Sequence, residues 1–133
     1  MVIGWKRVAC PVDFSEESRA AFKVAVDLCK RFQTGLTLLH VDEHGTADRE
    51  LAAWKKDAEA AGVGAVEVAH TKGNPQTAIA EWLNGSGVDL AVMGTHGRTG
   101  RAHALVGSTA ESTVRRARCP VMVVHADWAG LPR

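Results

Sequence analysis

A glycine-spaced segment that ends in hydroxyl side chains is the part of this sequence best suited to bind an anion. Gly94, Gly97 and Gly107 are followed directly by Ser108, which gives the spacing G-x2-G-x9-G-[ST]. Glycine lets backbone N–H groups approach a ligand without a Cβ in the way. Free N–H groups at a helix start, together with the positive end of the helix dipole, bind phosphate. The segment therefore predicts a phosphate site.

The charge pattern around this segment also favours a small anion. Residues 91–110 contain no carboxylate. The net charge is −3 over residues 1–89 and +4 over residues 90–133. This local excess is too small for a nucleic-acid groove, so nucleic acid is not an expected partner, but it suits one compact anion. The nearby candidate cations or donors are His96, Arg98, Arg101 and His103.

Ser108 has a second interpretation that needs no ligand. Ser108 and Glu111 have the S-x-x-E spacing of a capping box, in which the two side chains satisfy donors at a helix start. That interpretation leaves a long glycine-rich loop unexplained, and such loops in compact domains are usually functional or disordered. Neither a G-x-x-x-x-G-K-[ST] motif nor a G-x-G-x-x-G motif after the first strand is present.

The elements that must position this segment alternate between β-branched apolar runs and helical periods, which is typical of an α/β domain with a parallel sheet. We expect one domain over residues 1–133. The predicted strands are 7–12, 36–41, 65–70, 89–93 and 121–125, with 65–70 at an edge because it is the least apolar. The glycine segment then follows the carboxyl end of the fourth strand and leads into the fourth helix.

Local signals predict where the helices begin and end. Ser15 caps the first helix, whose apolar stripe runs to Phe32, and Gly35 ends it. The second helix starts near Thr46 and stops at Gly62, with Leu51, Trp54, Ala58 and Ala61 at core spacing. Asn74 and Pro75 are the cap and first residue of the third helix, and its buried face is Ala78, Ile79, Trp82 and Leu83.

The cysteines and histidines favour packing over chemistry. Cys10, Cys29 and Cys119 are odd in number, widely spaced and in apolar contexts, so we interpret them as free thiols in the core. His40 and His44 are four residues apart but straddle a strand end and a turn, which argues against a metal site.

The motifs VDLAVMGTHGRTG, VGSTAES and RCPVMVVH, with VACPVDFSEESRAA and LTLLHV in order before them, make this chain resemble the universal stress protein family over residues 5–125. The resemblance implies a doubly wound, open, five-stranded parallel sheet in the order 3-2-1-4-5, with a Rossmann-like arrangement of helices on both faces. It also implies a homodimer through residues 121–125 and a bound adenine nucleotide: ATP, ADP or AMP, with or without Mg²⁺.

The same resemblance assigns site residues. It implies an adenine and ribose pocket at Pro11, Val12, Asp13 and Val41, closed by Met93 and Gly94, and a phosphate site at Gly97, Arg98, Gly107, Ser108 and Thr109. Asp13 also has a simpler interpretation as a turn residue or helix cap. Two departures from the family stand out: the segment between the second strand and the second helix is short, and Arg101 and His103 stand where leucine and arginine are commoner.

Three functions are compatible with these residues. The first is an ATP-binding stress regulator without fast turnover, because the loop has neither a Walker lysine nor a carboxylate. The others are a slow adenine-nucleotide hydrolase, with Asp13 as the magnesium partner, and a dimeric scaffold with a vestigial pocket. A response-regulator receiver is disfavoured, because residues 70–72 after the third strand lack its phosphoacceptor aspartate and residues 125–126 after the fifth strand lack its lysine. No run of eighteen apolar residues and no secretory signal is found, so we expect a cytoplasmic protein without a membrane partner.

Overall fold

The sheet has the predicted strand order. The structure is a computed structural model that describes residues 4–42, 47–95 and 106–126. Within these ranges the elements are β1 (Arg7–Pro11), α1 (Glu16–Phe32), β2 (Gly35–Val41), α2 (Asp48–Ala61), β3 (Val66–Thr71), α3 (Pro75–Ser86), β4 (Leu90–Gly94), α4 (Ser108–Arg116) and β5 (Val121–Val124). All neighbouring strands are parallel, in the order β3-β2-β1-β4-β5. The predicted fold class is therefore confirmed.

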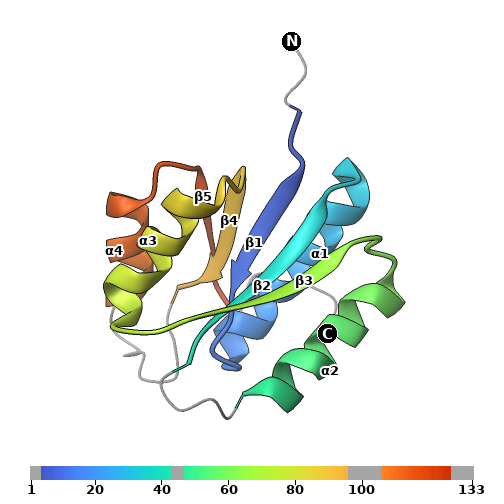
Figure 1. The fold of residues 1–133 in the computed structure, drawn as a ribbon, viewed down its shortest axis with the longest axis horizontal. Coiled ribbons are helices and arrows are strands. Elements are labelled where there is room, and N and C mark those ends of the chain that lie inside the picture. Colours follow the sequence, from blue (N-terminus) through green and yellow to red (C-terminus); the bar gives the residue numbers. More distant parts are fainter. Residues whose placement is uncertain (1–3, 43–46, 96–105, 127–133) are drawn as a thin grey trace.

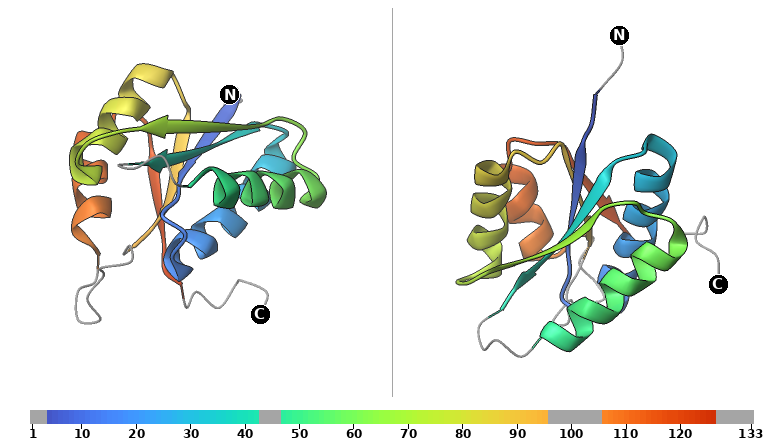
Figure 2. Two further views of the ribbon diagram at one scale, coloured as in Figure 1. Left: turned by 60° about the horizontal axis from the view of Figure 1, so that its bottom comes forward. Right: turned by 45° about the vertical axis from the view of Figure 1, so that its right-hand side comes forward.

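Helices cover both faces of this sheet, with α1 and α2 on one side and α3 and α4 on the other (Figure 1, Figure 2). The first core cluster, beneath α1 and α2, includes Cys10, Val12, Leu38 and Val92. The second, beneath α3 and α4, includes Ala9, Leu39, Ala91 and Met93. Successive strand residues point to opposite faces, which is why neighbours along one strand belong to different clusters. A strand buried on both faces has to be apolar throughout, as β4 is.

The predicted edge strand is confirmed. β3 pairs only with β2 among the described strands, and its residues Glu67 and Val68 are exposed. Opposite, β5 pairs with β4 and carries the exposed Met122. β1 lies in the middle of the sheet between β2 and β4. Its last residue, Pro11, ends the strand as predicted.

The first helix starts as predicted but ends earlier. The Ser15 hydroxyl accepts a hydrogen bond from the Ser18 N–H at 3.1 Å, which makes Ser15 the N-cap. The helix stops at Phe32 because Gln33 adopts a left-handed conformation with φ 55°, and Gly35 is instead the first residue of β2. Phe32 is 58% exposed, so it lies outside the buried stripe, and its ring packs edge to face with that of Trp5.

The second and third helices follow their local signals closely. Asn74 caps α3 by accepting from the Gln76 N–H, and Pro75 is its first residue, as predicted. Gly62 ends α2 with φ 113°. The predicted start of α2 at Thr46 lies outside the described residues, and Ala47 is the N-cap. The predicted buried faces are confirmed, except that Trp54 and Trp82 are half-buried and Ala61 is exposed.

No helix within residues 4–42, 47–95 and 106–126 is both long enough and apolar enough to span a membrane.

Candidate functional site

The carboxyl edge of the sheet brings the ends of β1 and β4 side by side. The strand order reverses at this pair, since β2 lies on one side of β1 and β4 on the other. Open α/β sheets bind ligands at such a switch point. The Thr95 N–H donates to the Val124 carbonyl, and the Gly107 N–H donates to the Thr95 carbonyl. The start of α4 is therefore tied to the end of β4, across the edge predicted to bind phosphate.

Three of the predicted pocket residues share one face of the sheet. Met93 belongs to the core beneath α3 and α4, and the half-buried Val41 packs against that core. Pro11 lies between Cys10 and Val12, which both belong to the opposite core, so strand alternation places it on the same face as Met93. Pro11 and Met93 are buried and Val41 is half-buried, so on this face the carboxyl ends of β1, β2 and β4 are apolar.

Val12 points to the other face. Its side chain is 4% exposed in the core beneath α1 and α2. Its N–H donates to the Leu39 carbonyl at 2.8 Å, and its carbonyl accepts from His40 Nδ1 at 2.7 Å. Both backbone groups of Val12 are thus engaged within the protein. Its assignment to the ligand pocket stays a prediction.

Asp13 organises the turn between β1 and α1. Its Oδ1 accepts from the Ser15 N–H at 3.1 Å and from the Ser15 hydroxyl at 2.6 Å. Its own N–H donates to the Ser18 hydroxyl. The next residue, Phe14, has φ 66°, which is unusual for a bulky side chain. The turn-residue interpretation of Asp13 is confirmed, and contact with a ribose stays a prediction.

Gly94 is required by packing, whatever binds nearby. A Cβ on Gly94 would lie 2.7 Å from the carbonyl carbon of Glu17 in α1 and 2.8 Å from its oxygen. Real Cβ atoms do not approach a backbone so closely. The sequence pattern predicted a glycine here for ligand approach. The structure shows that packing against α1 requires it as well.

The start of α4 differs from the capping-box interpretation. Gly107 is the N-cap and has no side chain to bond the helix start, and Ser108 is the first helical residue. The Glu111 carboxylate pairs with Arg115 at 2.8 Å instead of turning back to the helix start. The capping box at Ser108 is therefore wrong. Thr109 follows in the same first turn. The N–H groups of a first turn have no hydrogen-bond partner within their own helix.

Gln76 was not predicted as a site residue, yet it contacts this helix start. Its Nε2 donates to the Ser108 hydroxyl oxygen at 3.0 Å. The two residues are far apart in sequence and meet because α3 packs beside α4. No local pattern signals such a contact. Two predicted phosphate residues, Gly97 and Arg98, lie outside the described residues, as do His96, Arg101 and His103.

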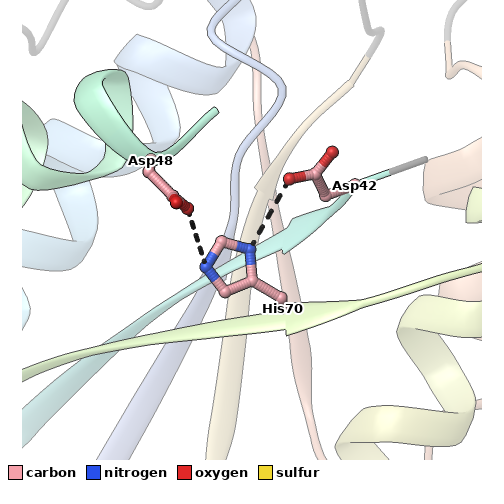
Figure 3. Close-up of side chains that lie close together, drawn as sticks. All are labelled: Asp42, Asp48 and His70. Carbon is pink, nitrogen blue, oxygen red and sulfur yellow. Dashed lines mark ion pairs between the residues drawn. The ribbon is translucent and has the colours of Figure 1, made fainter. Parts of the chain in front are cut away.

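A second cluster missed by the sequence analysis lies at the same edge of the sheet. The His70 ring of β3 stands between two carboxylates, with Nδ1 3.9 Å from Asp42 and Nε2 3.5 Å from Asp48 at the start of α2 (Figure 3). One donor atom from each residue lies within 4.8 Å of the others, the spacing of a candidate metal site. The two ring nitrogens diverge, however, so one ion cannot use both contacts. His70 therefore lies between the end of β2 and the start of α2.

The described cysteines are free thiols, as predicted. Cys10 and Cys29 are buried and Cys119 is half-buried. Burial raises the pKa of the Cys10 thiol far above its ordinary range, and a nearby Cys29 raises it further. Burial also raises the pKa of Cys29 and of Cys119. Because the thiolate is the nucleophile, none of these residues suits covalent chemistry at the edge of the sheet.

Comparison with known proteins gives one consistent family. The model of the universal stress protein family matches residues 4–61 and 44–125. A universal stress protein of Methanocaldococcus jannaschii is 31% identical over 142 residues, which cover 90% of this chain and 82% of that protein. A putative universal stress protein of Staphylococcus haemolyticus is 30% identical over 145 residues, covering 95% and 88%.

Solved structures agree in fold. A universal stress protein crystallised in complex with cAMP has a TM-score of 0.78 and 26% identity, covering 92% of this chain and 98% of that one. UspA of Lactobacillus plantarum has a TM-score of 0.82 and 24% identity, covering 90% and 97%.

Proposed function

This chain belongs to the universal stress protein family, and on that premise we propose that it binds an adenine nucleotide, ATP in particular, and acts as a stress-response regulator without fast turnover. The base would rest on the apolar face made by Pro11, Val41 and Met93. The phosphates would lie at the start of α4, at Gly107, Ser108 and Thr109. The cAMP complex of a similarly folded relative supports an adenine nucleotide as the ligand.

One observation carries this proposal. The residue after β4, Thr95, and the N-cap of α4, Gly107, are joined by the hydrogen bond from the Gly107 N–H to the Thr95 carbonyl. This bond brings the positive end of the α4 dipole to the switch point of the sheet, where the ends of β1, β2 and β4 carry the apolar residues Pro11, Val41 and Met93. A nucleotide matches this arrangement, because its planar base suits the apolar residues and its phosphates suit the helix start.

The chemistry of the site argues for binding over hydrolysis. Asp13 is the one carboxylate among the described residues assigned to the site, and its Oδ1 already accepts two hydrogen bonds from Ser15. Fast phosphoryl transfer needs a held metal and a positioned base or water. Mg²⁺ would therefore be held chiefly by the phosphates. Among the described site residues, Asp13 is the one carboxylate that could contribute a further ligand.

We test binding by titration calorimetry with ATP and adenosine. A variant with Val41→Asp places a charge on the apolar face, and Val68→Asp makes the same change on an exposed strand residue outside it. Val41→Asp should lower the affinity for both ligands by at least about tenfold, or about 1.4 kcal/mol. Val68→Asp should change neither affinity. Single-turnover assays should show hydrolysis slower than about one event per minute, far below common enzyme turnover. A wild type that binds neither ligand at millimolar concentration would refute the proposal.

The proposal includes a homodimer through β5. The outer edge of β5 is not paired with any described strand, and Met122 on it is 38% exposed. A short, uncharged, β-prone edge is an aggregation hazard unless it is covered. Pairing with a second copy about a two-fold axis covers the edge and closes the assembly.

A further inference from the structure

We propose that Gln76 is a positioning residue that directs the hydroxyl proton of Ser108 toward the anion at the start of α4. The inference rests on the proposed nucleotide site and assigns a role there to a residue of α3. Helices α3 and α4 then bind phosphate together: Ser108 contacts the phosphate, and Gln76 orients the Ser108 hydroxyl.

The direction of one hydrogen bond carries the inference. Gln76 Nε2 donates to Ser108 Oγ at 3.0 Å. A serine hydroxyl has two acceptor lone pairs and one donor proton. Because the amide occupies a lone pair, the proton of Ser108 is left to donate elsewhere. Ser108 is the first residue of α4, at the positive end of its dipole, so an anion there receives both this proton and the N–H groups of the first turn.

The backbone of Gln76 is held on two sides, which fixes where its side chain can reach. Its N–H donates to the Asn74 side chain at 3.0 Å, within the cap of α3. Its carbonyl accepts a short hydrogen bond from the Ser112 hydroxyl, one turn further along α4. The side chain has only to reach back to Ser108. Groups held in the productive geometry before binding lose less entropy when the ligand arrives.

The opposite end of the same helix pair provides a matched control. Asn84 Nδ2 donates to the Arg116 carbonyl at 3.0 Å, and its Oδ1 accepts from the Arg118 N–H at 2.8 Å. Asn84 therefore joins α3 to the carboxyl end of α4 by an exposed amide, as Gln76 joins it to the start. Both of these hydrogen bonds are to backbone groups, and neither group belongs to the proposed site. Loss of Asn84 reports on the helix pair alone.

The experiment compares ATP and adenosine affinities for the wild type, Gln76→Ala, Gln76→Glu, Ser108→Ala, Asn84→Ala and the double variant Gln76→Ala with Ser108→Ala. Thermal melts confirm that each is folded. Gln76→Ala should weaken ATP by about three- to tenfold, the range of one hydrogen bond, and leave adenosine unchanged. Gln76→Glu should weaken ATP further, because a carboxylate only accepts and would draw the Ser108 proton away from the phosphate.

The double-variant cycle separates positioning from packing. Once Ser108 is alanine, Gln76→Ala should have no further effect on ATP, and Asn84→Ala should leave both ligands as in the wild type. ATP binding by Gln76→Ala at the wild-type level would overturn the inference alone. An equal loss in Asn84→Ala, or a full further loss in the double variant, would also overturn it by showing a packing effect. A wild type that binds neither ATP nor adenosine would overturn the proposed function and this inference with it.

Discussion

Gly94 at the end of β4 lies against the backbone of Glu17 in α1, so closely that a Cβ on the glycine would come 2.7 Å from the Glu17 carbonyl carbon. The contact joins the predicted ligand edge to the first turn of α1. It involves backbone atoms on one side, which cannot rotate away as a side chain would. The end of β4 is thus positioned by packing before any ligand is considered.

We predict that Gly94→Ala lowers the free energy of unfolding by about 1–3 kcal/mol, the common cost of overpacking a rigid contact. Gly85→Ala is the matched control, since a Cβ there meets nothing within 4 Å and the residue lies in α3. Alanine is the better helix former by roughly 1 kcal/mol, so this control should be neutral or stabilising. Urea unfolding measures both. Equal stability of Gly94→Ala and the wild type would contradict the packing reason.

Gly107→Val should separate folding from phosphate binding. Gly107 has φ −71° and ψ 161°, a conformation that a β-branched residue adopts readily. The fold should therefore lose less than about 1 kcal/mol, since glycine is a middling N-cap. If phosphates approach this backbone, ATP binding should weaken while adenosine binding stays. The same result is expected of Gly97→Val on the sequence pattern. Calorimetry with both ligands checks it, and normal ATP affinity in both variants would remove the loop from the site.

Two substitutions at Asp13 should separate its effect on adenosine affinity from its effect on the stability of the turn between β1 and α1. Asp13→Asn keeps an Oδ1 that can accept from Ser15, whereas Asp13→Ala loses both bonds. The alanine variant should thus be less stable by roughly 1 kcal/mol, and the asparagine variant nearly as stable as the wild type. Both should bind adenosine and ATP more weakly by a similar factor, about tenfold, if the carboxylate accepts from a ribose hydroxyl. Unchanged adenosine affinity in Asp13→Asn would leave Asp13 with its turn role only.

Cys10 should make stability depend on alkaline pH. Burial raises the pKa of the folded thiol, so the folded protein keeps a proton that the unfolded chain releases above the ordinary value of 9.0. The folded state then binds more protons than the unfolded state, and the free energy of unfolding falls as pH rises past 9.0. One proton corresponds to about 1.4 kcal/mol per pH unit. Urea unfolding between pH 7.5 and 10.5 should show a shallower fall for Cys10→Ala, and identical slopes would contradict the prediction.

The dimer can be tested at a single backbone group. The carbonyls of Pro120 and Val124 accept from Ala91 in β4 and from Thr95 directly after it, so strand alternation turns the N–H of Val123 to the outer edge. Val123→Pro removes that donor without removing a bond to β4. The wild type should sediment as a dimer at micromolar concentration and the variant should shift toward monomer, with Val68→Pro on the opposite edge strand for comparison. A monomeric wild type would exclude dimerisation through β5 at these concentrations.

Much of the fold could be predicted because its signals are local. Ser15 and Asn74 cap their helices through bonds within three residues, and Pro75 begins α3 because its fixed φ suits a first turn. The apolar run of β4 indicates burial on both faces. The boundaries that moved did so for equally local reasons, as at Gln33, whose left-handed conformation ends α1 two residues before Gly35.

The sequence by itself determined the order and type of the elements and the place of the glycine-rich segment after β4, since periodicity and turn chemistry act over a few residues. Only the tertiary structure decided which distant groups meet. It placed Met93 and Val41 on one face and Val12 on the other, gave Gly94 a packing role against Glu17, made Gly107 the cap of α4, and brought Gln76 to Ser108. These relations depend on strand pairing and helix packing between segments far apart in the chain, and no local pattern specifies such contacts.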